Sequence, residues 1–260
     1  MSARPAHVET GRNGTPLLFL HGVGGGHAAW DAQLPYFAAR GYRAVAWDAP
    51  GYGASPAVEP YDLEHVATAL VALISDLDLP PAVLVGHSMG GFIALETYAR
   101  FPDQVKALAL SFTSPAFGGS EGDFQRQFIQ ARLGPLDAGK SMAQMARALT
   151  PSLSGARSLP GALEHAERIM SGVPAPTYRK AVRLLTTFDR RALLSQIRVP
   201  TLVLAGSDDR TAPPSVMERM AQKIPGAEYQ LLEGCGHLGP MDQPEAFNEA
   251  LAGFLARRSL

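Results

Sequence analysis

The chain has 260 residues, of which 46% are hydrophobic, and its formal net charge at pH 7 is −1. A chain of this length can bury one large core as a single α/β domain. The balanced charge gives no reason to expect nucleic acid or an anionic membrane as a partner. The lone cysteine, Cys235, excludes an intramolecular disulfide and is typical of a protein of a reducing compartment.

The N-terminal residues, from Met1 to His7, lack the apolar stretch of a signal peptide, and no apolar run is long enough to span a bilayer. A cytoplasmic protein is therefore expected. The scattered histidines show no ligand spacing with cysteines or carboxylates, so neither a metal site nor a cofactor is predicted.

Short apolar runs alternate with amphipathic stretches along the first half of the chain. The apolar runs are typical of buried strands and cover residues 17–20, 43–47, 82–85 and 105–110. Helical spacing of apolar residues occupies the intervals at 30–40, 63–77 and 92–98. This alternation predicts an α/β fold with a doubly wound, mostly parallel sheet that is covered by helices on both faces.

The alternation is interrupted between about Pro115 and Phe188. Short helical pieces, broken by glycine and proline, replace it at residues 124–132, 142–149, 163–171 and 178–185. One crossover seldom needs so many residues, so we expect a helical lid at 115–188. The core then comprises residues 1–114 and 189–260, with further strands at 199–205 and 228–232 and helices at 214–224 and 244–255.

The segment Gly86–Gly91 reads Gly-His-Ser-Met-Gly-Gly and lies between a predicted strand and a predicted helix. In that context Gly-x-Ser-x-Gly is typical of a nucleophilic serine. Glycine at positions 86 and 90 removes side chains that would collide in a tight turn. The helix N-terminus behind Ser88 favours developing negative charge. Glycine-rich turns are also common in proteins without catalysis, so this motif alone leaves both interpretations open.

Two later strand ends carry the partners that a catalytic serine needs, namely a histidine base and a group that orients it. The adjacent carboxylates Asp208 and Asp209 follow the strand that ends at Ala205, and His237 follows the last strand. The carboxyl ends of parallel strands meet at one edge of the sheet. The order Ser, Asp, His therefore favours a catalytic triad at that edge.

The motifs resemble those of lidded serine α/β-hydrolases over most of the chain. The matching pieces are His21-Gly22, Asp48-x-Pro50-Gly51-x-Gly53-x-Ser55, Gly86–Gly91, Gly206-x-x-Asp209-x-x-x-Pro213, Gly236-His237 and Asp242-Gln243-Pro244. The resemblance implies an α/β-hydrolase fold with the helical lid inserted after the sixth strand. It implies Ser88 as the nucleophile, His237 as the base and then the acid, and Asp209 as the orienting acid, with Asp208 as the alternative.

The same resemblance implies an oxyanion hole formed by the backbone N–H groups of Val23 and Met89. His21 is expected to shape that loop, and Asp48 to tether its own turn. His87, beside the nucleophile, is interpreted as a structural residue or a pocket wall.

The stretch at 188–201 is similar to that of enol-lactonases and of bacterial esterases once labelled haloperoxidases. We therefore expect hydrolysis of a carboxylic ester or lactone of a small apolar or aromatic-derived acid. Hydrolases of carbon–carbon bonds in ring-fission products share most motifs, but usually carry an aromatic residue where this chain has Leu238. A lyase or cofactor-free oxygenase, and a small-molecule receptor on the same fold, are the alternatives from other classes.

The expected partner is a small-molecule substrate, and the sequence does not decide between a monomer and a homodimer. Large apolar residues that can line its pocket are Trp30, Phe117, Met142, Tyr178, Phe188 and Leu238, although each also fits a core or lid position. Lid arginines can bind a substrate carboxylate, but solvated surface charge is their ordinary role; they are Arg126, Arg132, Arg179 and Arg183.

Overall fold

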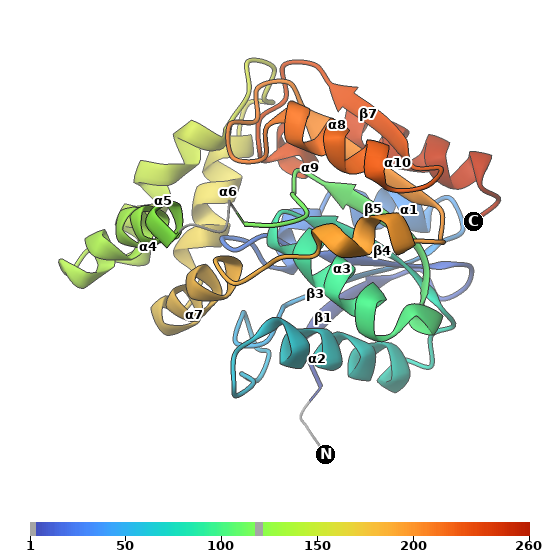
Figure 1. Cartoon of the computed structure of the whole chain (residues 1–260), viewed down its shortest axis with the longest axis horizontal. Coiled ribbons are helices and arrows are strands. Elements are labelled where there is room, and N and C mark those ends of the chain that lie inside the picture. Colours follow the sequence, from blue (N-terminus) through green and yellow to red (C-terminus); the bar gives the residue numbers. More distant parts are fainter. Residues whose placement is uncertain (1–3, 118–121) are drawn as a thin grey trace.

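The computed structural model describes residues 4–117 and 122–260, and in this part of the chain a seven-stranded sheet forms the core (Figure 1). The strand order is β1-β3-β2-β4-β5-β6-β7, and every neighbouring pair is parallel except β1 and β3. The strands are β1 (His7–Thr10), β2 (Pro16–Leu20), β3 (Arg43–Trp47), β4 (Ala82–His87), β5 (Val105–Ser111), β6 (Thr201–Gly206) and β7 (Glu228–Leu232). The predicted doubly wound, mostly parallel sheet is confirmed.

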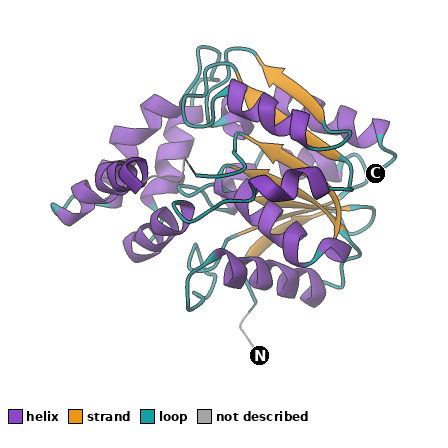
Figure 2. Cartoon of the chain, viewed as in Figure 1, coloured by secondary structure: helices purple, strands orange, loops and turns teal. Residues whose placement is uncertain are grey.

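Helices cover both faces of this sheet (Figure 2). One face carries α1 (Gln33–Ala38) and α10 (Pro244–Arg257), and the other carries α2 (Leu63–Asp76), α3 (Met89–Arg100) and α8 (Pro214–Lys223). Shorter helical pieces are η1 (His27–Trp30), η2 (Pro102–Gln104), η4 (Arg191–Gln196) and α9 (Gly239–Asp242). No helix in the two described ranges is long and apolar enough to cross a bilayer.

The central strands separate two apolar clusters because successive side chains of a strand point to opposite faces. In β2, Leu17 and Phe19 pack in the cluster beneath α1 and α10, whereas Leu18 and Leu20 pack in the cluster beneath α2 and α3. All five residues of β2 are buried. Burial on both faces explains why these strands are continuous apolar runs in the sequence.

Four helices lie between β5 and β6, and we call them the inserted helices: α4 (Gly122–Asp137), α5 (Met142–Leu149), α6 (Ala162–Ser171) and α7 (Ala175–Leu185). The 3₁₀ helix η3 (Thr150–Leu153) joins α5 to the loop before α6. In Figure 1 they form a group at the left of the sheet. Residues 118–121 of the predicted lid lie outside the described residues.

The insertion follows the fifth strand of the described chain, which corrects the expected position after the sixth. Before the insertion the described residues contain one edge strand, β1, followed by the four strands that the apolar runs predict. The sequence pattern does not predict β1, because it is short and only partly buried.

Two helix boundaries also differ from prediction, and each lies close to a proline. The predicted helix at 30–40 divides into η1 and α1, with Pro35 in the first turn of α1, where its missing N–H costs nothing. The predicted end near Arg132 is too early, since α4 continues through Gly134 and Pro135. Proline there removes only one hydrogen bond close to the end of the helix.

Candidate active site

Ser88 occupies a strained turn between β4 and α3, with φ +53° and ψ −116°. A positive φ is unfavourable for serine, so the surrounding structure must hold it. The Ser88 N–H donates to the carbonyl oxygen of Ser111 at 3.0 Å, and the Thr113 hydroxyl donates to the Ser88 carbonyl oxygen at 2.8 Å. A Cβ at Gly90 would lie 1.9 Å from the carbonyl oxygen of Leu20, so only glycine fits there.

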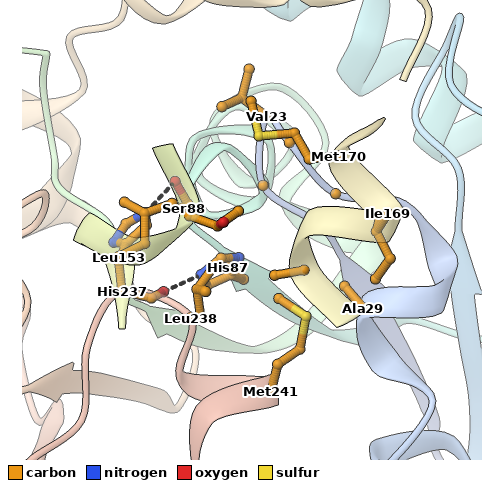
Figure 3. Close-up of a pocket in the computed structure, with 15 residues that line it drawn as sticks. Val23, Ala29, His87, Ser88, Leu153, Ile169, Met170, His237, Leu238 and Met241 are labelled. Atoms are coloured by element: carbon orange, nitrogen blue, oxygen red, sulfur yellow. Dashed lines mark hydrogen bonds between the residues drawn. The ribbon is translucent and has the colours of Figure 1, made fainter. Parts of the chain in front are cut away.

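A chain of two hydrogen bonds joins Ser88, His237 and Asp209. The His237 Nε2 lies 3.0 Å from the Ser88 Oγ, and its Nδ1 lies 2.8 Å from the Asp209 Oδ2 (Figure 3 shows the contact with Ser88). The carboxylate accepts the Nδ1 proton, so Nε2 is left to accept the proton of the serine hydroxyl. The three residues follow β4, β7 and β6, whose ends meet at one edge of the sheet.

The surroundings of Asp209 keep its carboxylate ionised. Burial raises its pKa, but the ring of His237 and the backbone N–H groups of Ala212 and Thr211 outweigh burial and bring the pKa below its ordinary value. These N–H groups donate to Oδ1 at 2.9 and 2.7 Å. Asp208, the alternative acid, is exposed and accepts a hydrogen bond from the N–H of Ala156 instead. The structure thus pairs Asp209, and not Asp208, with His237.

His87 supports the loop that carries His237. Its Nε2 donates to the carbonyl oxygen of His237 at 2.7 Å (Figure 3), and burial, followed by the charge of His237, lowers the pKa of His87 to about 3. The ring is therefore neutral at physiological pH, with its proton on Nε2. It also lines a cavity beside Ser88.

The loop after β2 lies against Ser88. A Cβ at Gly22 would be 3.2 Å from the Ser88 Cβ. His21 Nε2 accepts the N–H of Ala49 at 3.0 Å, so its Nδ1 carries the proton that is donated to the Gly22 carbonyl oxygen at 2.8 Å. Burial lowers the pKa of His21, which keeps this neutral tautomer.

The N–H groups of Val23 and Met89 are the two donors expected to face a substrate oxygen. In the described part of the chain, neither donates a hydrogen bond to another group. The Tyr52 hydroxyl fixes the carbonyl oxygen of Val23 at 2.9 Å. Asp48 tethers the same loop through the backbone N–H of His27, at 2.8 Å.

Two cavities meet at Ser88 and His237, and both also contact Val23 and Leu153. The first cavity is apolar beyond this junction, with side chains of η1, α6 and the His237 loop on its wall (Figure 3): Ala29, Ala166, Ile169, Met170, Leu238 and Met241. The second cavity extends toward α4 and α7, and its larger side chains are Phe92, Phe112, Phe117, Phe128, Arg132, Tyr178 and Leu185.

Three of the predicted pocket residues line these cavities: Phe117, Tyr178 and Leu238. The other three pack elsewhere, which corrects the expectation for them. Trp30 is fully buried between Phe19 and Phe247 in the core. Phe188 is buried and stacks on Phe92 at 4.0 Å between ring centres without lining either cavity, and Met142 is buried in α5.

Leu153 and Ile169 also line the cavities but were not among the predicted residues. The apolar spacing of α6, with Ala162, Ala166 and Met170 buried, is the signal by which Ile169 could have been found. No periodicity indicates Leu153, because it ends the short helix η3.

The segment after η3 docks directly on the loop that carries His237. The His237 N–H donates to the Leu153 carbonyl oxygen at 2.7 Å, and the Arg157 N–H donates to that of Gly234 at 2.9 Å. The Asp242 carboxylate accepts the N–H groups of Gly155 and Gly236, each at 3.3 Å. The two stretches are therefore joined both by direct backbone hydrogen bonds and by the Asp242 carboxylate.

A serine in a strand–turn–helix at the carboxyl edge of a doubly wound sheet, bonded to a histidine and an aspartate from later loops, is the arrangement of α/β-hydrolases. Residues 15–244 match the model of the family described as alpha/beta hydrolase fold, so the chain belongs to this family. The described residues contain no group of three histidine, cysteine or acidic side chains that could hold a metal ion.

The similarity to named relatives covers nearly the whole chain. The protein is 31% identical to the "Putative non-heme bromoperoxidase BpoC" of Mycobacterium tuberculosis, over 94% of each chain. It is 27% identical to 3-oxoadipate enol-lactonase 2 of Acinetobacter baylyi, over 93% of this chain and 88% of that one. A thermophilic esterase from Thermogutta terrifontis superposes with a TM-score of 0.85 at 28% identity, over 97% of this chain and 93% of the other.

Proposed function

We propose that the protein is a serine hydrolase that cleaves a carboxylic ester or lactone of a small apolar or aromatic-derived acid. The hydrogen-bond chain from Asp209 through His237 to Ser88 is the observation that carries this proposal. The names of the similar esterase and enol-lactonase support the bond type. The apolar wall of the first cavity supports an apolar group on one side of that bond.

In the proposed reaction the Ser88 Oγ attacks the substrate carbonyl carbon while the Nε2 of His237 takes the hydroxyl proton. The carbonyl oxygen becomes negative and accepts hydrogen bonds from the N–H groups of Val23 and Met89. The tetrahedral intermediate then expels the alcohol oxygen, which receives the proton from His237. An ester between the acid and Ser88 is left.

Hydrolysis of that ester repeats the sequence with water as the nucleophile. His237 takes a proton from the water, hydroxide adds to the acyl carbon, and the Ser88 oxygen leaves with the proton that His237 returns. Asp209 orients the ring and stabilises its charged form throughout. No step needs a cofactor.

We further propose that residues 115–188 act as a lid on a core of residues 1–114 and 189–260. Support comes from the cavity walls, since Leu153, Ile169, Met170 and Tyr178 all belong to this segment and lie beside Ser88 or His237. The size and polarity of the substrate therefore depend on how these helices pack.

Rapid mixing with p-nitrophenyl butyrate tests the function, because an acyl-enzyme releases a burst of nitrophenol before steady turnover. Ser88→Ala should abolish the burst, and a fluorophosphonate probe should label the wild-type chain at Ser88. Ser152→Ala, an exposed serine of η3, should behave as wild type. Undiminished turnover by Ser88→Ala would contradict the mechanism, and tight binding without turnover would favour a receptor.

A further inference from the structure

Arg132 places a positive charge in the second cavity beside the nucleophile. The residue belongs to α4, and its side chain shares this cavity with Ser88 and His237. Of the described residues that line the cavity, none is aspartate or glutamate. The remainder of the described wall is apolar, carries hydroxyl groups or is the His237 ring, so no carboxylate of residues 4–117 or 122–260 lines the cavity beside the guanidinium.

Three other arginines of the inserted helices form ion pairs, whereas Arg168 and Arg183 form none within the described residues and line neither cavity. Arg126 pairs with Asp123, Arg179 pairs with Asp137, and Arg147 pairs with Glu167 at 3.1 Å. Within residues 4–117 and 122–260, Arg132 forms no ion pair. Its partners are aromatic instead.

The aromatic contacts of Arg132 hold its charge at the cavity. Its guanidinium carbon lies 5.3 Å from the centre of the Phe128 ring, which is a cation–π contact. Burial raises the pKa of Tyr178, and the Arg132 guanidinium beside the phenol opposes part of that rise. The Tyr178 hydroxyl is thus a second hydrogen-bonding group next to the cation.

A half-buried cation without a counter-ion is stabilised when a ligand supplies the missing anion. The planar guanidinium matches a carboxylate through two parallel hydrogen bonds. One arginine fits a monoanion better than a phosphate dianion, which usually collects several cations. The arrangement therefore selects a carboxylate.

We infer that the substrate carries a free carboxylate on one side of the scissile carbonyl, bound by Arg132 and Tyr178 in the second cavity, and an apolar group in the first. This inference rests on the proposed function, because it assigns the two sides of the same ester or lactone. The chemical class is the half-ester or acidic lactone of a dicarboxylic acid, or an ester of a hydroxy acid.

A matched pair of esters tests the inference by titration of released acid. Monomethyl glutarate ends in a carboxylate at the position where methyl valerate ends in a methyl group. Wild type should hydrolyse the charged ester at least tenfold more efficiently in kcat/KM. 3-Acetoxypropionate and propyl acetate give the same comparison on the alcohol side, and preference for the anion in either pair agrees with the inference.

Arg132→Gln should remove that preference by lowering kcat/KM for the charged ester at least tenfold more than kcat/KM for its neutral partner, since the guanidinium charge acts on the charged substrate. Arg183→Gln is the matched control, because Arg183 is an exposed arginine of α7 that lines neither cavity. Equal hydrolysis of charged and neutral esters in both pairs, or a preference that survives in Arg132→Gln, would overturn the inference and leave the proposed function intact.

A binding measurement separates this inference from the chemistry. In the Ser88→Ala background, calorimetry should show at least one charged ester binding tenfold more tightly than its neutral partner. The double variant with Arg132→Gln should lose the difference. Equal affinities in Ser88→Ala would overturn the inference even without turnover, whereas absence of turnover together with failure to label Ser88 would contradict the proposed function.

Discussion

The backbone N–H of His237 donates a 2.7 Å hydrogen bond to the carbonyl oxygen of Leu153, which ends η3. The histidine that contacts Ser88 is therefore positioned by the inserted segment as well as by β7. This contact, with those of Gly155, Gly234 and Gly236 around it, makes the cavity wall and the histidine loop one structural unit.

Gly155→Ala should disrupt this unit. A Cβ at position 155 would lie 2.3 Å from the Gly234 carbonyl oxygen and 2.4 Å from the Gly236 nitrogen, and backbone cannot move aside as a side chain can. We expect kcat for p-nitrophenyl butyrate to fall at least tenfold, which corresponds to about 1.4 kcal/mol of barrier. Gly172→Ala on the same segment meets no heavy atom closer than 3.4 Å and should match wild type. Equal kcat values in the two variants would contradict the expectation.

Asp209→Asn should leave the fold intact and disable the histidine. An amide in place of the carboxylate favours the wrong ring tautomer, and the corresponding change in serine proteases lowers kcat about 10⁴-fold. Asp208→Asn, at the adjacent exposed position, should stay within about twofold of wild type. Steady-state kinetics with circular dichroism as a folding check compares the two, and similar losses would argue against Asp209 as the orienting acid.

The neutral state of buried His87 should make the fold sensitive to acid. Its pKa is about 3 in the folded protein and near 6.5 when unfolded, so between these values the unfolded chain binds the additional proton. The free energy of unfolding should therefore decrease as the pH falls through this window, by up to about 1.4 kcal/mol per unit from this residue.

Urea unfolding between pH 4 and 7 measures that dependence. His87→Gln keeps a donor for the His237 carbonyl oxygen but cannot titrate, so its slope against pH should be shallower than that of wild type. Ser88→Ala keeps the His87 ring and should retain the wild-type slope. Parallel slopes for His87→Gln and wild type would show that His87 does not contribute.

Met170→Ala should enlarge the first cavity and shift substrate preference toward longer apolar groups. Each methylene accommodated contributes about 0.8 kcal/mol, which is about fourfold in kcat/KM. The measurement is the ratio of kcat/KM for a long-chain ester to kcat/KM for a short-chain ester, taken in one series with the chain in the acid and in another with the chain in the alcohol. Met142→Ala also truncates a buried methionine of an inserted helix, but it lines neither cavity, so it should lower the melting temperature without changing the ratio.

The central strands were predictable because burial on both faces leaves an unambiguous apolar run. β3 occupies the predicted residues, and β2 begins one residue earlier than its apolar run. Edge strand β1 was not predictable, since its four residues are only partly buried and give no run to detect. Packing also decided that α4 continues past Gly134 and Pro135, against their local preference.

At the site, the convergence of strand ends made the proximity of Ser88, Asp209 and His237 predictable, and their catalytic roles stay a prediction. The pocket wall was far less predictable, because it depends on tertiary packing of short helices. Trp30 and Met142 are buried like Tyr178, yet only Tyr178 lines a cavity beside Ser88. Nothing in the sequence separates Arg132 from Arg126; the structure does, because Arg126 pairs with Asp123 whereas Arg132 lines the second cavity.

The close backbone contact between Gly155 and the His237 loop determines which segments of the chain can be exchanged for those of related proteins. A graft that replaces α4 and α5 alone leaves this junction native and exchanges the wall that carries Arg132. A graft of the whole inserted segment must also bring the matching loop at 234–242, because a single Cβ at Gly155 or Gly236 already collides with backbone. The part of the specificity that Arg132 carries can therefore be exchanged with the first half of the insertion, whereas the second half must be exchanged together with the loop that carries His237.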